Sequence, residues 1–554
     1  SMASFTVTNL LDFGTGSLRQ AILDANGLGG ADEIFFDSGL SGGTINLTGG
    51  GLLITDDLTI NGLGADFLSV DASGSSLSRV FNIDDGDDDN FLDVLLDGLT
   101  ITGGNSEFLG EGGGGIFNAE NLTVTNSIIS GNSSFYDTGG ISNSGDLTVT
   151  NSIISGNSSF YDAGGINNSG ELTVTNSSIS DNSSFYDTAG ISNSGELTVT
   201  NSSISGNTGN FGTGGINNSG ELTVTNSSIS DNNTVSNTGG ISNSGELTVN
   251  NSTISGNFSR GIAGIENSGT LTVTNSTISD HESEYVGTIG NTGELTVTNS
   301  TISSNISTFG NSVTNSGGLA LTNSTISGNF SNQGTAGIEN SGELALTNST
   351  ISGNSSLADA IIRNSGELTV TNGTIYGNYS YFSSISNSSN DLATISNTII
   401  AGNTNSQIHN NTSADVFGDF TSNGFNLIGD ITGSTGFEND LTLTSLGGIS
   451  IADVLDTNLT NNGGFTLTHA LIAGSPAIDA GNNNDISALT DQRGAGFERI
   501  VDSNNDTIAV VDIGAFEVQQ QSTAVPETSS MLGLLGLVIV ASGSILRRKL
   551  KRKL

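Results

Sequence analysis

The sequence contains no cysteine and no tryptophan, and only two of its 554 residues are proline. Without cysteine, neither a disulfide nor a thiolate-metal site holds the fold together. Cationic residues are scarce as well. The chain has twelve lysine and arginine residues, six of which lie within residues 547–553, and its formal net charge is −43. A body this acidic lacks the clustered cations that bind a polyphosphate, so nucleic acid is excluded as a partner.

Glycine, asparagine, serine and threonine dominate what is present, and one line of sequence recurs. "GELTVTNSSIS" stands at 170–180, 195–205 and 220–230. The Asn that ends "LTVTN" returns every 24 or 25 residues, and we call this the first Asn column. It begins with Asn126, Asn151, Asn176, Asn201, Asn226 and Asn251. A period this constant indicates a solenoid.

Each repeat contains three short alternating runs, represented by "GGISNSG", "ELTVTNS" and "SISGN". Glycine or asparagine separates the runs, which favours three strands and three turns over a helix. The sequence therefore predicts an all-β protein, a single-stranded parallel β-helix with three strands per coil of 24–25 residues. Leu172, Val174 and Ile179 are expected to point into its core.

Two further Asn columns share the register of the first. The second begins with Asn132, Asn157, Asn182, Asn207, Asn232 and Asn257, after which His281 takes the place of Asn. The third begins with Asn143, Asn168, Asn193 and Asn218. Stacked coils lie ~4.8 Å apart, so we expect all three columns to form hydrogen-bonded ladders.

The chain divides into five parts on these patterns. Residues 1–26 form an N-terminal strand and a short helical cap, in which Ser17 caps the helix and Leu18, Ile22 and Ala25 share one face. Residues 27–445 form the β-helix, most regular over about 112–403. Residues 446–518 are expected to form an irregular closing segment, 519–528 a linker with a short motif, and 529–554 a hydrophobic segment with a basic tail.

Several stretches resemble known bacterial families. "GGGGIFNAENLTVTNSIISGN" (112–132) and the repeats after it are similar to right-handed parallel β-helix repeat proteins. "NGGFTLTHALIAGSPAIDAG" (462–481), "TDQRG" (490–494) and "DIGAFE" (512–517) resemble the choice-of-anchor Q proteins, which are secreted β-helices with varied sorting signals. The resemblance implies a right-handed helix and a cell-surface or extracellular location.

The C-terminal tail resembles a PEP-CTERM sorting signal. Val525, Pro526 and Glu527 form the short motif, and an apolar run of 16 residues and a basic cluster follow it. The resemblance implies export and cleavage by an exosortase-type enzyme, with the tail in the membrane before processing. A permanent tail anchor is the alternative. "SMASFTVTNLLDFG" has no basic or strongly apolar leader, so we expect an export signal outside this sequence.

The sequence offers little for catalysis. Polysaccharide lyases and glycosidases need carboxylates or cations that converge in one groove, whereas the repeats carry isolated acids at one turn. His281, His409 and His469 are widely separated. We therefore predict that the protein is not an enzyme. The alternative is a polysaccharide lyase or glycoside hydrolase with a groove in the less regular coils near 50–110 or 400–445.

Calcium is the only cofactor that the sequence points to. Asp84, Asp85, Asp87, Asp88 and Asp89 crowd one loop. Asp502, Asn504 and Asp506 alternate in another, and oxygen-rich loops suit Ca²⁺. Solvated acidic loops without an ion are the alternative interpretation.

Aromatic residues recur as "SSFYD" in three adjacent coils and are candidates for a contact surface. They are Phe135, Tyr136, Phe160, Tyr161, Phe185 and Tyr186. Exposed aromatic rings bind sugar rings or partner proteins, although the Phe rings could instead turn inward. We therefore predict an exported adhesion or scaffold protein that binds extracellular polysaccharide or a cell-surface protein. Paired Thr columns such as Thr173 and Thr175 leave ice binding as a minor alternative.

Overall fold

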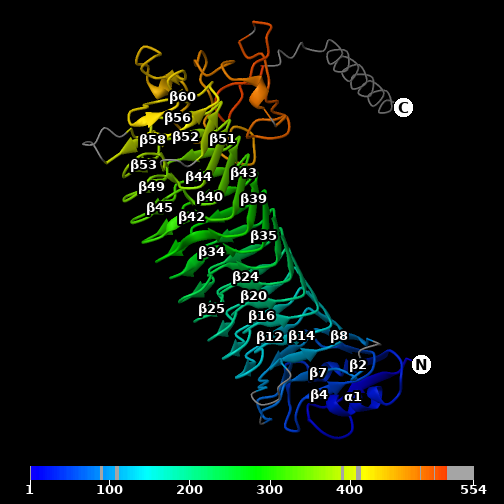
Figure 1. Ribbon diagram of the computed structural model, residues 1–554. Helices are drawn as coiled ribbons and strands as arrows, with labels where there is room; N and C mark the ends of the chain where they lie inside the picture. The colour runs from blue at the N-terminus through cyan, green and yellow to red at the C-terminus, as the bar shows by residue number, and fades with distance from the viewer. Residues whose placement is uncertain are drawn as a thin grey trace, which may run out of the picture.

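The computed structural model is an elongated parallel β-helix whose coils stack along one axis (Figure 1). It describes residues 2–75, 77–87, 91–106, 112–388, 392–406, 413–486, 488–504 and 506–520. Four parallel sheets run along the rod, and we name them A, B, C and D. Within the described residues they contain 17, 17, 16 and 12 strands, respectively. The predicted all-β fold, a parallel β-helix, is confirmed.

A regular coil contributes one strand to each sheet. In one such coil these are β18 (Ile166–Asn168) in sheet C, β19 (Glu171–Thr175) in sheet A, β20 (Ser178–Ser180) in sheet B and β21 (Ser183–Ser184) in sheet D. The first three strands are the predicted ones. The fourth has two residues, too few for an alternating pattern to indicate it.

The sheets differ in where they begin and end. Sheet A runs from β1 (Ser4–Val7) to β59 (Thr421–Ser422), sheet B from β3 (Gly43–Asn46) to β62 (Leu441–Thr442), sheet C from β4 (Leu52–Ile54) to β61 (Ser434–Thr435) and sheet D from β13 (Ser133–Ser134) to β57 (Thr404–Asn405). Successive coils pair residue for residue, so Leu172 lies beside Leu197. Every side-chain column in the sequence is therefore a column in space.

Helix α1 (Leu18–Asn26) covers the N-terminal end of the rod, as the sequence predicts (Figure 1). The Ser17 side chain accepts a hydrogen bond from the Gln20 N–H, and Leu18, Ile22 and Ala25 are buried. The helix packs on β1 and β4, so it shields edges that would otherwise be open to pairing. Among the described residues, no helix is both long and apolar enough to span a membrane.

The core is a stack of aliphatic side chains. In one coil Ile166, Leu172, Val174 and Ile179 are all fully buried, which confirms the predicted inward positions. The second and third Asn columns lie inside as well. The Asn182 Nδ2 donates to Asn207 Oδ1 over 3.0 Å, and the Asn168 Nδ2 donates to Asn193 Oδ1 over 2.7 Å. Two of the three predicted ladders are therefore present in the regular coils.

The first Asn column forms no ladder in its earlier coils, so the prediction of a hydrogen-bonded ladder was wrong for this column there. From Asn126 to Asn251 its side chains are exposed, and over this described range no hydrogen bond joins neighbouring members. Their backbones have φ of 48–50°, in the left-handed region that Asn tolerates better than most residues. Asn151, Asn176, Asn201 and Asn226 thus recur because the turn needs this conformation. Hydrogen bonds within the column appear only farther along, as between Asn299 and Asn275.

The closing segment (446–518) is irregular. Its described residues form the 3₁₀ helices η2 (Ile451–Asp453) and η3 (Asn483–Asp485) and isolated antiparallel bridges such as Thr460 with Thr468. Its apolar side chains form a second core with residues of the last coils, including Ile399 and Leu427. The segment therefore folds back along the side of the rod.

Candidate binding surfaces

A stack of exposed aromatic rings follows the corner after sheet D. We call it the aromatic ladder, and it consists of Phe135, Tyr136, Phe160, Tyr161, Phe185, Tyr186 and Phe211. Phe135 and Phe160 stack with ring centroids 4.7 Å apart at an interplanar angle of 4°, and Tyr161 and Tyr186 stack at 5.2 Å. The register of the coils therefore brings all six predicted aromatic residues together.

The Tyr rings form the outer row of the ladder. Tyr136 is 56% exposed, Tyr161 46% and Tyr186 48%, whereas Phe160 and Phe185 are half-buried beneath them. Phe211, 49% exposed, extends the ladder by one coil and was missed because its segment no longer reads "SSFYD". Its position 25 residues after Tyr186 was the available signal. Flat, exposed rings of this kind can stack on sugar rings or on partner side chains.

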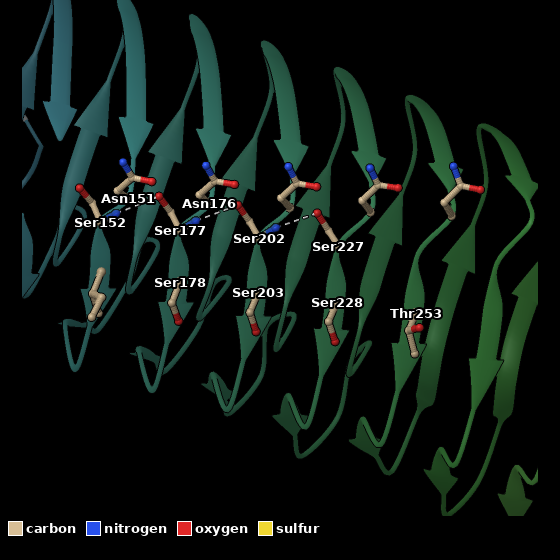
Figure 2. A pocket seen from close by; sticks show the side chains of 14 residues that line it. Asn151, Ser152, Asn176, Ser177, Ser178, Ser202, Ser203, Ser227, Ser228 and Thr253 are labelled. Atoms are coloured by element: carbon tan, nitrogen blue, oxygen red, sulfur yellow. Dashed lines mark hydrogen bonds between the residues drawn. The ribbon is translucent and has the colours of Figure 1, made fainter. Parts of the chain in front are cut away.

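A polar groove lies at the turn between sheets A and B, and we call it the open groove. It has a volume of about 890 Å³ and is lined by Asn151, Ser152, Ile153, Asn176, Ser177, Ser178, Asn201, Ser202, Ser203, Asn226, Ser227, Ser228, Asn251 and Thr253. Figure 2 shows these side chains in three parallel rows. None of the lining residues, all in the described part of the chain, is charged. The groove is therefore neutral on a strongly acidic protein.

The middle row of the groove is a buried serine ladder that sequence reasoning missed. The Ser152 backbone N–H donates to Ser177 Oγ over 3.1 Å, and the Ser177 N–H donates to Ser202 Oγ over 3.0 Å (Figure 2). Each serine directly follows an Asn of the first column, and this "NS" pair was the available signal. The ladder fixes the floor of the groove, so the Asn row and the outer Ser row are presented at constant spacing.

The structure gathers part of the predicted calcium loop. Ligand oxygens of Asp84, Asp85 and Glu120 lie within 4.8 Å of one another. Glu120 is buried, which raises the pKa of its carboxyl group, and it accepts hydrogen bonds from the Leu92 and Asp85 N–H groups. Asp87 is not in this cluster, and Asp88 and Asp89 lie outside the described residues.

Glu120 was not predicted, although the sequence holds a signal for it. It stands where later coils have Gly145, Gly170 and Gly195. A Cβ at any of those glycines would collide with the carbonyl of the residue below it in the preceding coil. Glu120 stacks on Leu92 of the preceding coil, and the run of glycines begins only after it.

The second predicted calcium loop is internally hydrogen-bonded. Asp502 accepts from the Asp506 and Thr507 N–H groups, and Asn504 Oδ1 accepts from the Asp506 N–H. Burial, together with repulsion from Asp502 and Asp506, raises the pKa of nearby Asp479. Calcium binding stays a prediction at both loops.

Titration with Ca²⁺ tests that prediction. If the Asp84 cluster is a site, millimolar Ca²⁺ raises the unfolding temperature of the wild type, because a ligand that binds only the folded state stabilises it. Glu120→Gln should abolish the rise, and Glu171→Gln, at an exposed carboxylate outside both loops, should leave the rise unchanged. Differential scanning calorimetry in Ca²⁺ and in chelator measures the unfolding temperature of each protein. An equal rise in all three proteins would assign the effect to general screening of acidic charge.

Two of the three histidines and one buried carboxyl group make hydrogen bonds within the described fold. His281 replaces Asn in the second ladder, and His469 bridges Ser352 Oγ and the Asp456 carbonyl at 2.8 Å each. Burial raises the pKa of Asp415 to about 7. Asp415 lies in the less regular coils of the alternative hypothesis, where it ends the second ladder by accepting from Asn403 Nδ2 over 2.8 Å. His409 lies outside the described residues.

Comparisons with known proteins concern the fold. No protein-family model and no curated protein matches the chain. Solved structures with a similar fold include the following two. Pectate lyase Pel9A is 14% identical with a TM-score of 0.22, and the match covers 93% of this chain and 96% of that one. PfbA, a surface adhesin of Streptococcus pneumoniae, is 13% identical with a TM-score of 0.25, over 85% of this chain and 100% of that one.

The comparison corrects one prediction. The statement that the protein is not an enzyme is overturned, because one of the similar structures is a pectate lyase. Neither likeness assigns an activity at these values, so catalysis is an open question for this chain. The sorting motif (Val525, Pro526 and Glu527) and the tail after it lie outside the described residues.

Proposed function

We propose that this is an exported cell-surface or extracellular β-helix protein that binds extracellular polysaccharide through its aromatic ladder. The observation that carries the proposal is the exposed row of Tyr136, Tyr161 and Tyr186, stacked in register over three coils. Aromatic faces attract the apolar faces of sugar rings, and a row of them suits a chain of sugars. Each ring of the ladder stacks on its neighbours, and restricting the rings before binding reduces the entropy that binding would cost.

The charge of the protein narrows the polymer class. A net charge of −43 repels anionic chains unless cations bridge them, which favours a neutral polysaccharide.

For export of the protein, we propose that residues 525–554 act as a sorting signal that is cleaved after export. The mature chain recovered from the cell envelope should then end near Glu527, as measured by mass spectrometry.

Removal of the outer row tests the binding proposal. We expect the variant Tyr136→Ser, Tyr161→Ser, Tyr186→Ser to lose about tenfold or more in affinity for a neutral extracellular polysaccharide, because interface energy is concentrated in such aromatic anchors. Tyr379→Ser, at a 38% exposed Tyr outside the ladder, is the matched control. Affinity electrophoresis in gels containing the polymer measures the change. Equal retardation of the two variants would rule out the ladder as the binding surface.

A further inference from the structure

The closing segment lies in a continuation of the open groove. Sheet B pairs Ser178, Ser203, Ser228 and Thr253 in unbroken register with Thr277, Thr301, Thr325, Thr350 and Thr374. The later members of this hydroxyl row contact residues more than 140 positions away in the sequence. Thr325 Oγ1 donates to the Leu467 carbonyl over 2.8 Å, and Thr374 Oγ1 accepts from the Ala515 N–H over 3.0 Å.

The first Asn column makes the same kind of contact in these coils. Asn348 Nδ2 donates to the Thr490 carbonyl over 2.9 Å. Asn397 makes a pair of hydrogen bonds with the backbone of Asn482, donating to its carbonyl over 3.0 Å and accepting from its N–H over 2.7 Å. Gln492 adds a side-chain amide that accepts from Thr350 Oγ1 and donates to Thr325 Oγ1. The two rows therefore recognise amide groups of an irregular polypeptide segment.

The same two rows are uncovered in the open groove. Asn348, Thr350 and Thr374 are 0–2% exposed beneath the closing segment. Asn151, Asn176, Asn201, Asn226 and Asn251 are exposed, and none of these five described side chains makes a hydrogen bond. The lining of the open groove is uncharged. The closing-segment residues that hydrogen-bond to the covered rows are uncharged as well, and they are Leu467, Asn482, Thr490, Gln492 and Ala515. The open groove thus offers unused partners for a peptide backbone.

We infer that the open groove binds an extended, neutral polypeptide segment of a partner protein through its Asn and Ser rows. The coils beneath the closing segment show how such binding works. There the Asn side chains hydrogen-bond to backbone amides, and the hydroxyl row contacts carbonyl and N–H groups. The groove and the aromatic ladder occupy different corners of the same coils. Peptide binding in the groove is therefore independent of polysaccharide binding at the ladder.

The chain provides its own matched substitutions for a test. Ile128 and Ile153 occupy the hydroxyl row in two coils, so this position accepts isoleucine, and Thr occupies it in the covered coils. The variant Ser178→Ile, Ser203→Ile, Ser228→Ile removes three hydroxyls, whereas Ser178→Thr, Ser203→Thr, Ser228→Thr keeps them. The probes are labelled peptides of residues 464–473 and 488–496, which carry the Leu467 and Thr490 carbonyls and Gln492, with scrambled peptides as controls.

Fluorescence anisotropy with the full chain measures the result. We expect at least one probe to bind the wild type and the Thr variant, and the Ile variant to bind it about tenfold more weakly, because three hydrogen-bonding groups are lost. Equal binding by the Ile variant, or no binding of either probe to the wild type, would overturn the inference. Displacement of bound probe by neutral polysaccharide would also overturn it, since the groove would then be the sugar site.

Discussion

Asn207→Ala should lower the free energy of unfolding by about 3 kcal/mol, the largest effect that we expect from a single substitution in the regular coils. Asn207 Oδ1 accepts from both the Asn182 backbone N–H and the Asn182 Nδ2, each over 3.0 Å. Its own Nδ2 donates to the Ile179 carbonyl and to Asn232 Oδ1. All of these groups are buried, so the loss of Asn207 leaves donors and an acceptor without partners where water cannot replace them.

Asn201→Gly in the same coil is the matched control. Asn201 is exposed, makes no side-chain hydrogen bond, and has a φ of 50° that glycine adopts without strain. We expect its effect to stay within about 1 kcal/mol. Urea unfolding followed by circular dichroism compares the two variants. The structure assigns the stabilising ladder to the second column, which contains Asn207, and not to the first column, which contains Asn201. Similar losses of stability in the two variants would contradict this assignment.

A second large effect concerns acid. His281 is almost completely buried in the second ladder, and desolvation lowers its pKa from 6.5 to about 4. Its Nδ1 accepts from the Asn257 N–H over 3.1 Å and its Nε2 lies 3.0 Å from the Ile254 carbonyl, which fits the neutral ring with the proton on Nε2. A second proton would have to replace the hydrogen bond at Nδ1.

The sign of the pH effect follows from this depressed pKa. Between pH 6.5 and about 4 the unfolded chain binds a proton at His281 that the folded chain does not. The free energy of unfolding therefore falls as the pH falls through this window, by about 3 kcal/mol in total. Asp280 nearby favours the charged ring, but burial outweighs it.

His281→Asn isolates this contribution, because the other coils carry Asn at the position. Asp415 and Asp512, with pKa values raised to about 7 and about 6, titrate in the same range but are common to both proteins. The difference in unfolding free energy between the variant and the wild type should therefore grow from pH 7 to pH 4. A difference that is independent of pH would show that His281 does not titrate as the geometry requires.

The repeat period carried most of the fold prediction. Because coils stack in register, a constant spacing of 24 or 25 predicts columns, and alternation within "ELTVT" predicts which residues face the core. The period could not distinguish the three Asn columns, since all recur equally. What separates Asn201 from Asn207 is the local backbone, which is left-handed at Asn201 and not at Asn207, where the side chain is buried. That difference is conformational and leaves no mark in the spacing.

The candidate surfaces were predictable where they repeat and not where they end. The six aromatic residues of "SSFYD" were predicted, whereas Phe211 and Glu120 were missed because each breaks its local pattern. The fold-back of the closing segment was beyond prediction. Its contacts, such as Thr325 with Leu467, join residues 142 positions apart and have no periodicity. Long-range contacts between an irregular segment and a regular one depend on shape, which the sequence pattern does not encode.

Chromatography of the full chain with neutral extracellular polysaccharides tests the central claim most directly. Binding through the aromatic ladder predicts co-elution of the protein with a polymer of unchanged length, and loss of co-elution in the Tyr136→Ser, Tyr161→Ser, Tyr186→Ser variant. Shortening of the polymer would instead show an enzyme, and would direct attention to the less regular coils near 50–110 or 400–445. Separate elution from every polymer would contradict polysaccharide binding and leave a protein partner as the ligand.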